Sequence, residues 1–276
     1  MAKEFDFSDK DFQRVKKLVL EHTGICLSDI KHDMMYSRLA KRLRSLHLDS
    51  FSDYIDLIES GDDKELGNFT NSVTTNLTSF FREQHHFDYL KTTLIPTLMK
   101  LNADTRKIRV WSAGCSTGEE PYSLAITLKE SIPDSAGWDV KVLATDLDTN
   151  VLETGSSGVY SMDRVNGISS SILKRWFNKG KGENEGLVRA SNELRDMIIF
   201  KQLNLMEAWP VKVGVDVIFC RNVVIYFDKA TQAVLFDRYA EILRRDGFLV
   251  IGHSESLHRV TDRFNPLGKT IYQRTI

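Results

Sequence analysis

The second part of this sequence, after residue 106, alternates between short apolar runs and longer segments with helical periodicity. The predicted strands cover residues 108–113, 140–145, 197–203, 215–220, 248–252 and 270–273, and the predicted helices cover 119–130, a short segment from 148, and 229–244. Strands that alternate with helices form a mostly parallel sheet covered by helices. The pattern therefore predicts an α/β domain over residues 107–276.

One segment, at about residues 158–196, does not follow this alternation. It is rich in turn-forming residues, including Gly180, Gly182 and Gly186. We expect a small excursion from the main sheet with a few antiparallel strands. For the glycine-rich stretch at 177–186, a flexible surface loop is the alternative.

The first part of the chain reads as helical from residue 8 to residue 72, with no strand signal. Apolar residues recur at helical spacing in the first segment, at Phe12, Val15, Leu18 and Val19. A second helix is predicted at 29–46, a third at 51–59 ending near Gly61, and another short one from 62. These segments predict an all-α domain over residues 1–73.

Between the two domains lies a segment predicted to link them, residues 74–106. A polar loop at 74–79 is followed by a helix expected from Phe80 to about Met99.

In the second helix of the first domain, Ile30, Met34 and Leu39 are expected to face inward.

Composition excludes several classes of protein. The formal net charge of the 276 residues is −1, which gives no general reason to expect a nucleic-acid partner. The charged start is unlike a secretory signal, and no apolar run approaches the roughly 20 residues that span a bilayer. The three cysteines have no metal-type spacing, and the histidines form no metal-binding pattern. We expect a cytoplasmic protein with reduced thiols, no metal and no membrane insertion.

Ligands of open α/β sheets bind at the carboxyl ends of the strands, so the residues that follow each strand are informative. After the first strand, Gly114 and Gly118 allow a tight turn that opens a helix with Glu119 and Glu120. Carboxylates at a helix start repel phosphate, and no complete GxGxxG or GxxxxGK[ST] motif is present. A ligand with hydroxyls and a positive charge, such as S-adenosylmethionine (SAM), fits this loop better than NAD or ATP. The alternative is that both acids only cap the helix.

The next strands also end in polar groups. Asp146 follows the second strand, where a carboxylate can accept hydrogen bonds from ribose hydroxyls, while Asp148 is expected to cap the following helix. Asn204 and Leu205 follow the third strand and are candidates for the edge and face of an adenine. The fourth strand delivers Arg221, and its neighbours Asn222 and Tyr226, to the same edge.

These residues lie in segments that resemble the CheR family of chemotaxis-receptor glutamate O-methyltransferases. The matching segments are TTNLTSFFR (74–82), WSAGCSTGEEPYS (111–123), ATDLD (144–148), FCRNVVIYF (219–227) and GHSES (252–256). The resemblance covers nearly the whole chain. It implies an all-α N-terminal substrate-recognition domain joined to a SAM-dependent, Rossmann-like methyltransferase domain with a small antiparallel β-subdomain.

The resemblance also implies roles for individual residues. The implied cofactor-binding residues are Asn76, Thr78, Arg82, Gly114, Glu120, Asp146, Asn204, Leu205, Arg221 and Asn222. Glu120 is favoured over Glu119 as the cofactor contact, and both stay open. Arg82 and Tyr226 are the candidate catalytic residues, with Arg82 holding either the acceptor carboxylate or the cofactor carboxylate.

The implied substrate is the helical cytoplasmic region of methyl-accepting chemotaxis receptors, methylated on glutamates to give methyl esters and S-adenosylhomocysteine. Basic residues of the second helix would contact it, namely Arg38, Lys41, Arg42 and Arg44, although a solvated basic face is the alternative. Gly180, Gly182 and Gly186 mark a subdomain that would dock a receptor C-terminal peptide. A monomer that associates with receptor arrays is expected.

Two other functions remain open from sequence alone. A methyltransferase for a small molecule or nucleic acid would share the SAM pocket but would not need the basic helical domain. A SAM-binding adaptor that has lost catalysis would have no need for Arg82 and Tyr226.

Overall fold

The structure, a computed structural model, describes residues 4–211 and 213–275. Residues 1–3, 212 and 276, which include the ends of the predicted domain ranges, lie outside the described residues. Within the described ranges, no helix has the length and apolar character needed to cross a membrane.

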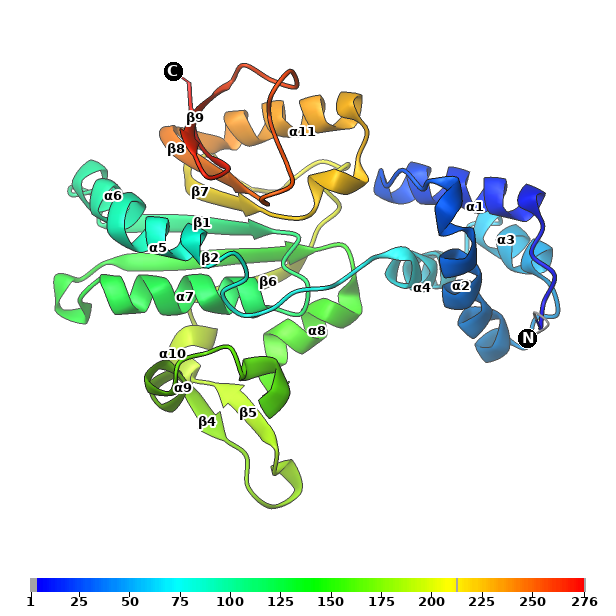
Figure 1. Ribbon diagram of the computed structural model, residues 1–276, viewed down its shortest axis with the longest axis horizontal. Helices are drawn as coiled ribbons and strands as arrows, with labels where there is room; N and C mark the ends of the chain where they lie inside the picture. The colour runs from blue at the N-terminus through cyan, green and yellow to red at the C-terminus, as the bar shows by residue number, and fades with distance from the viewer. Residues whose placement is uncertain (1–3, 212, 276) are drawn as a thin grey trace.

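The N-terminal part of the chain is a bundle of helices (Figure 1). Ser8 caps the first helix by accepting a hydrogen bond from the Asp11 amide, and Asp11 returns the bond to the Ser8 amide. The apolar side chains at helical spacing pack into one core with Phe51, Tyr54 and Phe69. The helices are α1 (Asp9–Thr23), the 3₁₀ turn η1 (Asp29–Lys31), α2 (His32–Leu46), α3 (Phe51–Glu59) and α4 (Asp63–Val73).

Ile30 does not face inward as the periodicity suggested. It is 91% exposed, whereas Leu39 is fully buried and Met34 packs against the core. Residues 29–31 form a separate 3₁₀ turn before α2, so Ile30 does not continue the apolar face of that helix.

The connecting segment leaves the bundle in an extended conformation and becomes helical later than expected. Phe81 and Glu83 have φ of 52° and 56°, a left-handed conformation that a helix cannot contain. The helix therefore begins at His85 rather than Phe80. It runs as α5 (His85–Tyr89), a π-helical turn η2 (Leu90–Leu94) and α6 (Ile95–Leu101).

The second domain is built on a seven-stranded sheet with strand order β6-β2-β1-β7-β8-β10-β9. The first five strands in this order are parallel, and the last two are antiparallel. The strands are β1 (Lys107–Ala113), β2 (Asp139–Asp146), β6 (Ile198–Gln202), β7 (Val215–Cys220), β8 (Leu243–Ile251), β9 (Phe264–Gly268) and β10 (Ile271–Arg274). Strand β9 was not predicted, because its sequence, FNPLG, has only two apolar side chains and a proline.

Helices cover the sheet on both faces because alternate residues of β1 point in opposite directions. Val110 packs in one core with α7 (Glu119–Ser131) and the α5–α6 segment. Trp111 packs in a second core with α11 (Lys229–Ile242) on the other face. The fold is thus an all-α domain followed by a Rossmann-like α/β domain.

Residues 158–196 form the predicted small excursion, which protrudes from the α/β domain (Figure 1). It follows α8 (Thr149–Ser157) and contains an antiparallel sheet with strand order β3-β5-β4. Its elements are β3 (Val159–Ser161), the 3₁₀ turn η4 (Met162–Val165), α9 (Ser170–Trp176), β4 (Phe177–Lys179), the 3₁₀ turn η5 (Gly182–Asn184), β5 (Leu187–Ala190) and α10 (Asn192–Arg195).

Candidate active site

A cavity of about 560 Å³ lies at the carboxyl ends of the parallel strands, between the α/β domain and the helical domain. From β1 the chain continues to β2 and β6 on one side of β1, and it then crosses to β7 on the other side. Open sheets bind ligands at such a change of direction. All eleven predicted cofactor-binding and catalytic residues line this one cavity: Asn76, Thr78, Arg82, Gly114, Glu120, Asp146, Asn204, Leu205, Arg221, Asn222 and Tyr226.

Gly114 has to be a glycine for two reasons. Its φ is +88°, and a Cβ atom there would lie 2.4 Å from Cγ2 of Val223. The amides of Gly114 and Cys115 both donate to the Thr145 carbonyl, at 2.8 and 2.9 Å, which folds the loop over the end of β2. The glycine thus lets the cavity wall from β1 contact the wall from β7.

The two neighbouring acids at the start of α7 have separate environments. Glu119 is fully buried away from the cavity, where it pairs with Arg164 and accepts from the Thr117 hydroxyl at 2.6 Å. Glu120 lines the cavity and accepts from Ser112 Oγ at 2.7 Å. Of the two, Glu120 is the one placed to contact a ligand in the cavity.

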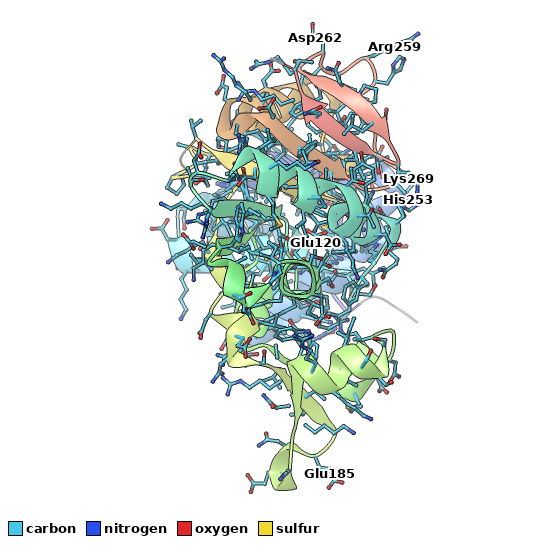
Figure 2. The ribbon with its side chains drawn as sticks, turned by 90° about the vertical axis from the view of Figure 1, so that its left-hand side faces the viewer. Glu120, Glu185, His253, Arg259, Asp262 and Lys269 are labelled. Carbon is cyan, nitrogen blue, oxygen red and sulfur yellow. The ribbon has the colours of Figure 1, made fainter. Side chains whose placement is uncertain are left out.

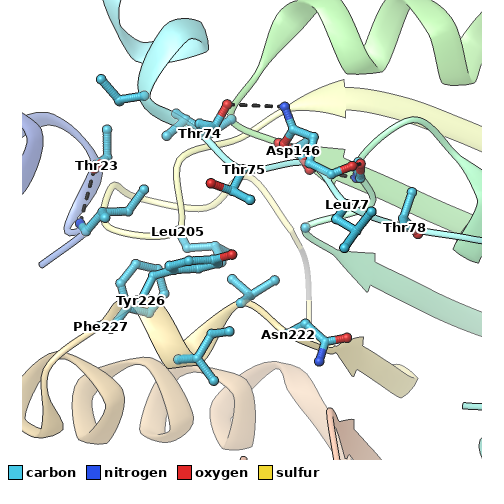
Figure 3. Close-up of a pocket in the computed structure, with 18 of the residues that line it drawn as sticks. Thr23, Thr74, Thr75, Leu77, Thr78, Asp146, Leu205, Asn222, Tyr226 and Phe227 are labelled. Carbon is cyan, nitrogen blue, oxygen red and sulfur yellow. Dashed lines mark hydrogen bonds between the residues drawn. The ribbon is translucent and has the colours of Figure 1, made fainter. Parts of the chain in front are cut away.

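Asp146 ends β2 with its carboxylate at the cavity (Figure 3). One oxygen accepts from the Ser116 amide at 2.7 Å and the other from the Asp148 amide at 3.1 Å. Burial raises the pKa of Asp146, and these amides lower it in part. Each carboxylate oxygen has a second lone pair, so the group keeps acceptor capacity for hydroxyls.

The connecting segment forms another wall of the cavity and is fixed by Asp148. The side-chain Nδ2 of Asn76 and the Thr74 hydroxyl donate to Asp148, at 2.7 and 2.9 Å. Asp148 also caps α8 through the Asn150 amide, as expected. Arg82, further along the segment, donates to the Leu77 carbonyl at 2.9 Å.

On the opposite side of the cavity, Leu205, Tyr226 and Phe227 lie together (Figure 3). The Asn204 side chain donates to the His22 carbonyl at 2.8 Å and accepts from the Met206 amide at 3.0 Å. Asn204 therefore joins the two domains, and its adenine contact stays a prediction.

Arg221 is the charged centre of the wall formed by β7. Its side chain is 2% exposed and contacts Glu120 at 2.9 Å and Glu83 at 3.2 Å. It also donates to the Arg82 carbonyl. Since this guanidinium is surrounded by protein groups, its main effect is to hold Glu120 and the connecting segment in place.

The helical domain supplies cavity residues that sequence analysis missed, at Ile25, Cys26, Leu27, Lys31 and Met34. The available signal was the break at Gly24. That glycine has a φ of +73°, and a Cβ there would lie 2.6 Å from the Met206 side chain. The Cys26 amide then donates to the Tyr226 carbonyl at 2.8 Å, so the turn after α1 closes the cavity.

The predicted substrate-binding residues lie outside the cavity, and two of the arginines have structural partners. Arg42 forms two hydrogen bonds with the buried Glu65, at 2.9 and 2.7 Å. Arg38 donates to the carbonyls of Val73 and Thr74.

The other predicted residues are closer to the surface. Arg44 pairs with Glu4 at 2.8 Å, and Lys41 is exposed. Gly180, Gly182 and Gly186 lie in the turn between β4 and β5, whose tip carries Glu185, far from Glu120 (Figure 2).

Within the described residues, Glu83, His85 and His86 bring potential metal ligands within 4.8 Å of one another. Glu83 already contacts Arg221 and accepts from His253 Nδ1 at 2.8 Å. A cation at this place would have to displace an existing ion pair.

The cavity suits SAM in size and in polar groups. Its volume lies within the roughly 300–1,000 Å³ of small-molecule sites. Asp146 has acceptor capacity for hydroxyls, Glu120 is a carboxylate for a cationic group, and Leu203 and Leu205 are apolar walls for a flat ring.

Comparison with known proteins agrees with this geometry. Residues 10–74 match the model of the CheR methyltransferase all-alpha domain, and residues 76–273 match that of the CheR methyltransferase SAM binding domain. The chain is 43% identical to chemotaxis protein methyltransferase 2 of Pseudomonas aeruginosa, over 98% of this chain and 94% of the relative. It is also 43% identical to the chemotaxis protein methyltransferase of Escherichia coli, over 99% and 93% of the two chains. With the protein of that name from Borreliella burgdorferi the identity is 37%, over 90% and 88%.

Proposed function

Because the chain belongs to the CheR methyltransferase family and is a SAM-dependent methyltransferase of chemotaxis, we propose that it methylates glutamate side chains of bacterial chemoreceptors. The products are glutamate methyl esters and S-adenosylhomocysteine. The observation that carries the proposal is the convergence of the predicted residues on one cavity that both domains close.

The proposed reaction requires little proton transfer by the protein. Bound SAM supplies an electrophilic methyl group. A glutamate carboxylate has an ordinary pKa of about 4.3, so it is already ionised at neutral pH and needs no general base. The protein has to align the acceptor and to exclude water, and good alignment is worth at most on the order of 7–11 kcal/mol.

Within the cavity, Asp146 and Glu120 are proposed to bind the polar parts of the cofactor, with Leu205 and Asn204 on its adenine side. Asn76, Thr78, Gly114, Arg221 and Asn222 complete the pocket. Arg82 and Tyr226 are the residues proposed to orient the acceptor. An arginine fork and a phenol hydroxyl can position a carboxylate by hydrogen bonds while leaving one oxygen free to attack.

The receptor is proposed to lie along α2, with its helical cytoplasmic region against the basic side chains. Since Arg38 and Arg42 are held by the helical domain itself, the charge that faces a partner comes mainly from the exposed Lys41 and Arg44, of which Arg44 also pairs with the exposed Glu4. Attraction between exposed charges is screened by salt, so this contact is expected to weaken as ionic strength rises.

A second contact is proposed at the small sheet. In the order β3-β5-β4, β4 is an edge strand, and an extended receptor C-terminal peptide could pair with such an edge. The turn glycines shape the end of this hairpin, because a Cβ on Gly180 would lie 2.0 Å from the Asn184 carbonyl oxygen. A monomer that acts in the cytoplasm at receptor arrays is part of this proposal.

The proposal is tested by transfer of labelled methyl groups from SAM to membranes that contain chemoreceptors. We expect base-labile label on the receptor with the native chain. Arg82→Ala is expected to lower the rate by on the order of 100-fold, since loss of alignment has effects of that size. The matched control is Arg245→Ala, an exposed arginine of β8 that does not line the cavity and should leave the rate unchanged.

The outcomes separate the rival functions. Tight SAM binding without label on any of several receptors would favour an adaptor. Label that is stable to base, or that appears on a small molecule, would show a different acceptor. Label on receptors lacking their C-terminal tail, at an undiminished rate, would remove the proposed docking at β4.

A further inference from the structure

The loop after β7 carries the cavity residues Asn222 and Tyr226, and the backbone of Asn222 has an uncommon conformation. Asn222 has a φ of +58°, which non-glycine residues seldom adopt, and a 3₁₀ turn follows at Val224–Tyr226. A short loop of this kind keeps its shape only if its backbone groups find partners. Those partners identify what fixes Asn222 and Tyr226 at the cavity.

The amides of the loop are held by Glu255, a residue of the 252–256 segment to which no role has been given above. One carboxylate oxygen accepts from the Asn222 amide at 3.0 Å and from the Gly252 amide at 2.6 Å. The other accepts from the Ile225 amide at 3.2 Å. Glu255 is 5% exposed and does not line the cavity, so it can act there only through the loop.

The carbonyls of the same loop are held from other elements. Gln232 of α11, which is 7% exposed, donates to the carbonyls of Val224 and Phe227 at 2.8 and 3.0 Å. The Tyr226 carbonyl accepts from the Cys26 amide of the helical domain. Glu255 and Gln232 thus hold the loop from within the α/β domain, and Cys26 holds it from the helical domain.

Gly252 allows the 252–256 segment to approach the 222–226 loop closely. A Cβ on this residue would lie 2.6 Å from Asn222 Nδ2 and 2.9 Å from the Asn222 amide nitrogen. The glycine is therefore required for the Glu255 carboxylate to reach the Asn222 amide. Two independent features, a buried carboxylate and a glycine contact, fix the same residue of the cavity wall.

We infer that Glu255 is a positioning residue for methyl transfer, which holds the 222–226 loop so that Asn222 and Tyr226 face the cavity. This inference rests on the proposed function for its effect on rate, but its effect on the loop is independent of the acceptor. A carboxylate suits the task because each of its oxygens is an acceptor, whereas a glutamine of the same shape presents an NH₂ group to one of the amides.

The test compares Glu255→Gln with Asp216→Asn. Asp216 is also a buried carboxylate, 3% exposed, that accepts a backbone amide, from Arg109 at 2.7 Å, but it lies at the opposite end of β7. Below the melting temperatures of both variants, Glu255→Gln is expected to lower kcat for receptor methylation at least tenfold, with a smaller rise in KM for SAM. Asp216→Asn is expected to keep kcat within twofold.

Hydrogen exchange provides a readout that needs no receptor. In Glu255→Gln the amides of Asn222 and Ile225 should exchange at least tenfold faster, and in Asp216→Asn they should not. If Glu255→Gln does not fold, Gln232→Leu releases the carbonyls of the same loop and should lower kcat in the same way. An unchanged kcat and unchanged exchange, or equal losses in Asp216→Asn, would overturn the inference. Faster exchange in an enzyme that methylates no receptor would leave the positioning role intact and contradict the proposed function.

Discussion

The two ends of strand β7 are built from the same kinds of residue but to different purposes. At the amino end, Asp216 accepts from Asn102 and from the Arg109 amide and pairs with Arg244 at 3.2 Å. At the carboxyl end, Arg221 pairs with Glu83 and Glu120. The first network joins strands and a helix end to one another, and the second also forms a wall of the cavity.

The two networks differ in how far their arginines are exposed to water and in the carboxylates that each arginine contacts. Arg244 keeps 26% of its side chain exposed to water, and the buried Asp216 would keep its hydrogen bonds from Asn102 and the Arg109 amide if Arg244 were removed. Arg221 is almost fully buried between two carboxylates, Glu83 and Glu120. We therefore expect the carboxyl end to be intolerant of substitution and the amino end to behave as an ordinary stabilising network.

The largest difference between the two ends of β7 is expected in the unfolding free energy lost when the arginine of each end is replaced. Arg221→Met would take the arginine away from the buried Glu120 and leave Glu83 with its histidine contacts, and breaking a buried ion pair costs about 3–5 kcal/mol. Arg244→Met should cost about 1.5–3 kcal/mol, the range typical of a hydrogen bond to a charged group. Urea unfolding measures both values, and equal losses would contradict the distinction between the two ends.

A second difference is expected in the dependence of stability on pH, through His86. This residue is fully buried next to the carboxyl-end network and donates from Nε2 to the Lys269 carbonyl at 2.9 Å. Burial, with the nearby Arg221 charge, lowers its pKa from 6.5 to about 4. The unfolded chain therefore binds this proton more readily than the folded chain does between those two values.

The sign of the effect follows from that order. Stability from neutral His86 is complete above pH 6.5 and is lost as the pH falls from 6.5 toward 4, by at most about 3.5 kcal/mol, since each unit is worth about 1.4 kcal/mol. Glu83, whose pKa is lowered to about 2, loses its stabilising charge only at lower pH. Between pH 7.5 and pH 4.5, the native chain should lose more unfolding free energy than His86→Gln does. Substitution of an exposed histidine, His258→Gln, is the control. If His86→Gln lost as much unfolding free energy between pH 7.5 and 4.5 as the native chain does, the effect could not be assigned to His86.

The sequence predicted the carboxyl end of the sheet better than any other part, and the reason is local. Asp146 is the last residue of one apolar strand and Arg221 directly follows another, so the period of each strand and its end locate the side chain. The same argument separated Asp148, a helix cap, from Asp146. Glu119, the neighbour of Glu120, could not be excluded as a cofactor contact from sequence, because its partner Arg164 is 45 residues away.

Features that depend on distant contacts were missed for the same reason. The closing of the cavity by Cys26 depends on a bond to Tyr226, 200 residues along the chain, and the exposure of Ile30 depends on a 3₁₀ turn that helical periodicity does not reveal. The partners of Arg42 and Arg38 are likewise set by the packing of α4. Their positions on a basic face were predictable, but not that their charges are used within the domain.

The smallest of the expected differences concerns two glycines of the β8 region, Gly252 directly after the carboxyl end of the strand and Gly247 at its middle. In Gly252→Ala the new methyl group would lie 2.6 Å from Asn222 Nδ2 and 2.9 Å from the Asn222 amide nitrogen, contacts that require the cavity loop to move. In Gly247→Ala its neighbours would be the Arg244 carbonyl and a Leu243 methyl at 3.0 Å, where small shifts suffice. Overpacking of the first kind costs about 1–3 kcal/mol.

We expect Gly252→Ala to lose about 2 kcal/mol of stability together with most of the methyl-transfer rate. Gly247→Ala should lose about 1 kcal/mol or less, because alanine is less costly than glycine in the interior of a strand and offsets part of the contact. Its rate should stay within twofold of the native value. The two variants bear on the same strand, so a rate loss in Gly247→Ala as large as in Gly252→Ala would mean that β8 transmits strain along its length. In that case the shape of the cavity would depend on the whole strand and not on the contact between Gly252 and Asn222.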